Sequence, residues 1–185
     1  IATGTMAAAA GGFTAVACMP NTRPVNDNAA VTRYILDKAA DCAVRVYPVG
    51  ALSRDSQGQQ LAEYGELKDA GAVALTDDGM PVVDSQLMRR AMEYADSHGL
   101  PVISHAEESS LSRNGCMNEG PVSTRLGLRG IPTAAESIMV YREIALADLT
   151  GLPIAFWGIL WLVVAAAAAL GCLLLAAAGR DEGRG

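Results

Sequence analysis

The sequence predicts an α/β protein built on a parallel sheet, either open or closed into a (β/α) barrel. Four short apolar runs recur at intervals of roughly 30 residues, and stretches of helical periodicity separate them. The runs are rich in Val, Ile, Leu and Ala without strict alternation, which is typical of strands buried on both faces. Alternating strands and helices indicate parallel pairing, but periodicity alone does not choose between an open sheet and a barrel. The predicted strands are residues 13–19, 44–50, 72–76 and 101–105.

Helical patterns fill the segments around these strands. Leu87, Met88 and Ala91 repeat at helical spacing, and Asp84 or Ser85 can cap the start of that helix. A capping-box pattern, T-A-A-E, opens the last helix before residue 150. The predicted helices are residues 29–41, 59–70, 84–98 and 133–149.

The C-terminal part of the chain has a different character. Residues 152–179 include no charged side chain, and Trp157 and Trp161 lie near one end. At about 1.5 Å per residue this stretch could cross a bilayer core of about 30 Å, and tryptophans suit the interface. The sequence therefore predicts three parts: a globular unit over 1–151, an apolar transmembrane-like helix over 152–179, and a polar tail over 180–185. A buried hydrophobic helix is the alternative for the second part.

Charge and cysteine spacing exclude some classes of protein. The net charge of −6 argues against a nucleic-acid partner, which would require a basic face. The four cysteines form no C-x-x-C pair, so neither a zinc ribbon nor a thioredoxin-like motif is expected. The chain starts at Ile1 without a signal-peptide pattern, so we expect the natural start to lie upstream.

Polar side chains follow three of the predicted strands. Asp77 and Asp78 follow the third, His105 the fourth, and Asn21 the first. In a barrel the carboxyl ends of the strands form the catalytic face. An Asp and a His at successive strand ends favour a metal site, with a simple turn and a structural histidine as the alternatives. Asn21 offers a two-sided hydrogen-bonding group, and Arg23 could bind an anion.

Four longer segments occur in order along residues 1 to about 151. They are A-A-A-A-G-G-F-T-A-V-A-C-M-P-N-T-R-P (7–24), L-T-D-D-G-M-P-V-V-D (75–84), G-L-P-V-I-S-H-A-E-E (99–108) and N-E-G-P-V-S-T-R-L-G-L-R-G-I-P-T-A-A-E (118–136). Any one of them is a weak signal. In combination they closely resemble dihydroorotase, in the long-chain bacterial class of the amidohydrolase superfamily.

The resemblance implies a fold, a cofactor and an activity. The fold is a partial (β/α)8 TIM-type barrel with about four of the eight strands, followed here by the apolar helix. The cofactor is zinc, with Asp78 and His105 as metal ligands and Asn21 as a ligand of the substrate carboxylate. Related enzymes use a carboxylated lysine where this family uses aspartate, and neither Lys38 nor Lys68 lies at a predicted strand end. The implied reaction is the reversible cyclisation of N-carbamoyl-L-aspartate to dihydroorotate in pyrimidine synthesis, through zinc-generated hydroxide.

The chain also departs from the family pattern. The family's D-x-H-x-H motif would precede Ile1, and a further zinc histidine and the general acid/base aspartate would follow Gly151. No catalytic acid or base is therefore retained, and two ligands are too few for a zinc site. We expect the chain alone to be inactive, with two exposed sheet edges.

The same resemblance sets expectations for partners and location. We expect a small-molecule substrate, no nucleic acid, and either a homodimer or a complex with aspartate carbamoyltransferase. The enzyme part is expected in the cytoplasm, with membrane anchoring only if the apolar helix is genuine. The abrupt break near Gly151 favours a frame error or a chimeric join over a genuine anchor.

Three other interpretations stay open. One is another cyclic amidohydrolase, an allantoinase or dihydropyrimidinase, against which the T-D-D-G segment counts. The second is a non-catalytic dihydroorotase-like subunit that scaffolds aspartate carbamoyltransferase. The third is a membrane-anchored protein with a degenerate half-barrel.

Overall fold

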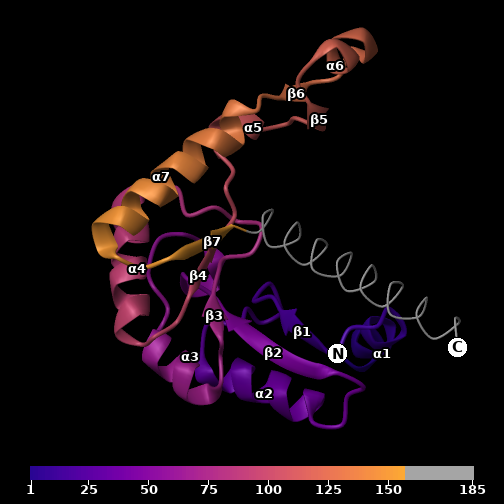
Figure 1. The fold of residues 1–185 in the computed structure, drawn as a ribbon, viewed down its shortest axis with the longest axis vertical. Helices are drawn as coiled ribbons and strands as arrows, with labels where there is room; N and C mark the ends of the chain where they lie inside the picture. Colours follow the sequence, from indigo (N-terminus) through magenta and orange to yellow (C-terminus); the bar gives the residue numbers. More distant parts are fainter. Residues whose placement is uncertain (157–185) are drawn as a thin grey trace, which may run out of the picture.

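Five parallel strands form the main sheet within residues 1–156, the part of the chain that this computed structural model describes (Figure 1). The strand order is β1-β2-β3-β4-β7, and every neighbouring pair is parallel. The order follows the chain, as expected when each strand is followed by a crossover to the next position. The strands are β1 (Ala15–Cys18), β2 (Arg45–Gly50), β3 (Ala74–Leu75), β4 (Val102–Ser104) and β7 (Ile154–Phe156).

Four helices cover one side of this sheet in an arc (Figure 1). They are α2 (Ala29–Ala39), α3 (Tyr64–Ala70), α4 (Ser85–Ser97) and α7 (Ala134–Thr150). The helix α1 (Ala2–Ala10) precedes β1, and a single 3-10 turn, η1 (Arg54–Ser56), follows β2.

Between β4 and α7 the chain leaves the sheet as an arm (Figure 1). The arm includes a second sheet of two short parallel strands. Its elements are α5 (Ser109–Ser112), β5 (Met117–Asn118), α6 (Pro121–Leu126) and β6 (Gly130–Ile131).

The hydrophobic core lies between the sheet and the covering helices. Leu67 of α3, Met92 of α4 and Leu75 of β3 are completely buried in it. A smaller cluster on the other face of the sheet joins Val49, Ala74 and Ile103, with Met19 and Ala155 packed against it. Neighbouring strand residues therefore point into apolar surroundings on both faces, which explains why the sequence showed continuous apolar runs.

Local signals in the sequence place the helix ends. The Asp84 side chain accepts hydrogen bonds from the amides of Gln86 and Leu87 and so begins α4 as predicted. Gly71 ends α3 with a left-handed φ of 107°, a conformation that favours glycine. Thr133 precedes α7 as predicted, but its side chain makes no capping hydrogen bond, so the expected capping box does not form there.

The four predicted strands are confirmed, but the predicted fold class is wrong in two respects. The half-barrel sheet has five strands, because Ile154–Phe156 pairs with β4 as β7. Leu152, only 6% exposed, belongs to the core. The sequence analysis places Leu152 and Ile154–Phe156 at the start of the apolar helix, so both positions are corrected.

The prediction of a transmembrane-like helix that begins at residue 152 is therefore wrong for the residues that the structure describes. Its first residues form a loop and a strand, and no helix within residues 1–156 is long and apolar enough to cross a membrane. The remainder of that predicted span, 157–179, and the predicted polar tail, 180–185, lie outside the described residues. The apolar composition was a poor guide here because a short strand of a parallel sheet can be equally apolar, and Ile154–Phe156 forms such a strand while only partly buried.

Candidate functional site

The polar segments singled out from the sequence follow the carboxyl ends of three strands in the same sheet. Asn21 lies beyond β1, Asp78 beyond β3 and His105 directly beyond β4. Because the strands are all parallel, these ends lie along one edge of the half-barrel. This is the edge at which open and closed parallel α/β sheets bind their ligands.

Asn21 and Asp78 meet in one hollow at this edge. The Asn21 amide nitrogen Nδ2 donates to Asp78 Oδ2 at 2.5 Å, across 57 residues of sequence. The hollow has a volume of about 420 Å³ and includes Thr22, Arg23 and Ser56 in its lining. Its lining therefore combines an amide, two hydroxyls, a guanidinium and the carboxylates of Asp77 and Asp78, which offers hydrogen-bond donors and acceptors to a polar ligand.

Asp77 and Asp78 are adjacent but have separate roles in the structure. Asp77 is only 4% exposed, and its Oδ1 accepts the Ser53 amide at 2.9 Å while Oδ2 accepts the Ser53 hydroxyl. Burial raises the pKa of Asp77, although the hydrogen bonds from Ser53 oppose the shift. Asp78 has a left-handed φ of 53° and is only half-buried, so its carboxylate is available at the hollow. Asp77 therefore holds the loop that contains Ser53, whereas the carboxylate of Asp78 is accessible from the hollow.

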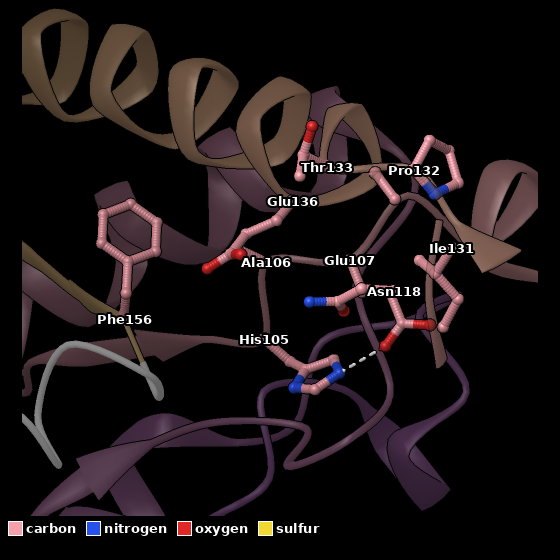
Figure 2. Close-up of a pocket in the computed structure, with 10 residues that line it drawn as sticks. His105, Ala106, Glu107, Asn118, Ile131, Pro132, Thr133, Glu136 and Phe156 are labelled. Carbon is pink, nitrogen blue, oxygen red and sulfur yellow. Dashed lines mark hydrogen bonds and ion pairs between the residues drawn. The ribbon is translucent and has the colours of Figure 1, made fainter. Parts of the chain in front are cut away.

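His105 lies in a second hollow, of about 310 Å³, between β4, β7 and the start of α7 (Figure 2). Its Nε2 is 2.8 Å from Glu107 Oε2, which fixes the orientation of the ring. Figure 2 shows Glu136 and Phe156 on the opposite side of the hollow from Asn118.

Glu107 is ionised more readily than a free glutamate. A hydrogen bond from the Ser112 side chain, followed by the one with His105, lowers the pKa of Glu107. An ionised carboxylate beside one ring nitrogen fixes the histidine tautomer and leaves the other nitrogen free for a ligand. One signal in the sequence indicates this arrangement, namely the acids that follow the strand-end histidine.

Other lining residues were not predicted. Asn118 and Thr133 enter the second hollow from the arm and from the start of α7, and Phe156 enters from β7. The T-A-A-E pattern marks Thr133 only as the start of a helix, and no short-range pattern places Asn118 or Thr133 in this hollow. Phe156 was missed because its segment was assigned to the apolar helix.

The two predicted metal ligands do not share a hollow. Asp78 lines the first and His105 the second, although they follow neighbouring strands. Within residues 1–156 no group of three His, Cys, Asp or Glu side chains is placed to hold a metal ion. Structural and catalytic zinc sites use three or four protein ligands. The described residues therefore do not fit a complete zinc site.

Two solved structures with a similar fold are hydantoinases. An L-hydantoinase (dihydropyrimidinase) from Arthrobacter aurescens superposes with a TM-score of 0.61 over 82% of this chain and 35% of its own, at 18% sequence identity. A D-hydantoinase superposes with a TM-score of 0.55 over 84% of this chain and 35% of its own, at 22% identity. At these identities the likeness shows that the half-barrel has the fold of part of a hydantoinase.

Sequence comparison identifies the protein family more narrowly than the fold does. The model of the dihydro-orotase-like family matches residues 1–157. A dihydroorotase of Desulfotalea psychrophila is 74% identical over 151 residues, which are 82% of this chain and 36% of that protein. A dihydroorotase of Syntrophobacter fumaroxidans is 67% identical over 152 residues, 82% of this chain and 35% of that protein.

The chain belongs to the dihydroorotase-like family. The predicted resemblance is therefore confirmed. The chain spans about a third of the length of these curated relatives.

Proposed function

We propose that this chain contributes one half of the active-site edge of a dihydroorotase, which interconverts dihydroorotate and N-carbamoyl-L-aspartate. The observation that carries the proposal is the contact of Asn21 with Asp78 at the carboxyl edge of the sheet. That contact lies in a polar hollow of a chain that is 74% identical to a dihydroorotase over 151 residues.

Each of the predicted residues has a role in this proposal. Asn21 binds the substrate carboxylate through its side-chain amide, and Arg23 adds a positive charge in the same hollow. Asp78 and His105 are two ligands of a zinc site whose other ligands come from outside residues 1–156. Glu107 orients the His105 ring through the 2.8 Å contact at Nε2. The general acid/base is not among these residues.

The partners follow from the same proposal. A small cyclic amide and its ring-opened acid are the substrates. Three further points stay predictions. They are the assembly as a homodimer or with aspartate carbamoyltransferase, the cytoplasmic location of the enzyme part, and the inactivity of the chain alone.

A chimeric enzyme tests the activity. The 151 aligned residues of the Desulfotalea psychrophila dihydroorotase are replaced by their counterparts from this chain. Purified chimera is assayed with dihydroorotate, hydantoin and allantoin. The proposal expects turnover of dihydroorotate well above that of the other two rings. A folded chimera that prefers hydantoin or allantoin would favour another cyclic amidohydrolase.

The scaffold interpretation gives a different result in the same assay. A folded chimera that binds aspartate carbamoyltransferase but turns over none of the three rings would support a non-catalytic subunit. Circular dichroism and size-exclusion chromatography, with the parent dihydroorotase as the control, establish that the chimera is folded.

A further inference from the structure

A fully buried carboxylate on α7 has no role in the site described above. Glu143 is 0% exposed, and its neighbour Arg142 is largely buried, with a side chain 16% exposed. Arg142 Nη2 donates to Glu143 Oε1 at 2.5 Å. A buried ion pair carries a large desolvation cost, which further hydrogen bonds offset only in part here, since Arg142 Nε and Glu143 Oε2 have no partner among the described residues.

The further hydrogen bonds of this pair go to two different segments. Arg142 Nη2 donates to the Val82 carbonyl at 2.8 Å, and Nη1 donates to the Val83 carbonyl at 3.0 Å. The Ser104 hydroxyl donates to Glu143 Oε1 at 3.1 Å. The pair therefore bridges a loop and a strand end that lie 60 and 39 residues away from it in the sequence.

Both segments lead directly to the predicted site residues. Val82 and Val83 belong to the loop that joins Asp78 to α4, and Ser104 is the last residue of β4, immediately before His105. The main-chain pairing of β3 with β4 involves only Leu75 and Val102, so few backbone contacts fix these two strand ends relative to each other. The side-chain bridge adds the missing connection at the carboxyl edge.

We propose that Arg142 and Glu143 are positioning residues that couple the loop after Asp78 to the strand end before His105. Neither residue lines a hollow of the site, so they act through the segments that they hold. The coupling is a property of the chain itself. Its importance for catalysis rests on the proposed function.

Hydrogen exchange in the full chain, measured without substrate or metal, tests the coupling. In Ser104→Ala the bridge loses its contact with β4, and Glu143 no longer fixes Arg142 as firmly. Amide exchange should rise at least about tenfold in residues 102–108 and also in residues 79–84, although the Ser104 hydroxyl donates to Glu143 and not to that loop. Exchange in β3 should stay unchanged.

Arg142→Met perturbs the bridge from the other end. It should raise exchange in residues 79–84 and, through Glu143 and Ser104, in residues 102–108, because coupling between two sites is reciprocal. Ser123→Ala is the matched control, since Ser123 is a buried serine whose hydroxyl bonds only within its own turn of the arm. It should change neither segment.

The result that overturns the proposal is local loosening alone. If Ser104→Ala raises exchange only in 102–108, and Arg142→Met only in 79–84, the pair does not couple the segments. If Arg142→Met unfolds the chain, the exchange of residues 79–84 in Ser104→Ala tests the proposal by itself. Because no activity is measured, failure of the dihydroorotase assay would leave this result intact.

Discussion

Replacing Asp77 by alanine should destabilise the chain through the loop that follows β2. The Asp77 carboxylate accepts the amide of Ser53 at 2.9 Å and also its hydroxyl, and Ser53 is completely buried. The Ser53 hydroxyl in turn accepts the Gly58 amide at 2.7 Å. The carboxylate therefore anchors the turn η1 to the end of β3.

The magnitude follows from the donors that would lose their acceptor. A buried amide without an acceptor costs about 1–3 kcal/mol, and the hydroxyl loses a bond to a carboxylate worth about 1.5–3 kcal/mol. Relief of the buried charge offsets part of this sum. We expect Asp77→Ala to lower the free energy of unfolding by about 2–3 kcal/mol.

Urea unfolding followed by circular dichroism measures this difference, with Asp78→Asn as the matched control, because asparagine tolerates the left-handed φ of Asp78 as aspartate does. Asp78 is the adjacent acid, half-buried, and its carboxylate bonds only to the exposed Asn21 side chain. Its replacement should change stability by less than about 0.5 kcal/mol. Equal losses in the two variants would refute the separation of a structural Asp77 from a presented Asp78.

Three further predictions concern the same chain. Burial raises the pKa of Asp77 above its ordinary value of 3.8, so its contribution to stability is present below that value and is lost as pH rises through the folded-state pKa. The stability of the wild type relative to Asp77→Asn should therefore shrink as pH rises above 3.8, and a constant difference would contradict the shift. Asp84→Ala removes the cap of α4 and should cost about 1 kcal/mol in urea unfolding, whereas no loss would mean that water replaces the cap. Gly50→Ala would place a Cβ 2.9 Å from Cδ1 of the buried Leu67 and should cost about 1–3 kcal/mol, and a neutral result would show that Leu67 moves freely.

Most of the fold could be predicted because the signals were local. The apolar runs located β1 to β4, and the Asp84 cap located the start of α4. These features depend on residues close together in the sequence. The fifth strand could not be separated from an apolar helix, because its pairing with β4 joins residues that are distant in the sequence.

The candidate site was predictable only in part, for the same reason. Asn21, Asp78 and His105 were found from their positions after strands, and the parallel order of the sheet brings those ends to one edge. Their distribution over two hollows depends on loop geometry, including the left-handed φ of Asp78. The Arg142–Glu143 bridge had no sequence signal, since adjacent opposite charges on a helix are usually exposed.

The most direct test of the account compares the two histidines of this chain in the chimeric dihydroorotase. His105 lies at the active-site edge, whereas His98 caps the end of α4 and packs edge-on against Tyr94, with ring centroids 4.9 Å apart. The measurement is kcat/KM for dihydroorotate together with bound zinc per chain. His105→Ala should lower both, kcat/KM by at least about a hundredfold, and His98→Ala should leave both near the parent values. A His105→Ala chimera that is folded and keeps its zinc and its activity would contradict the proposed site.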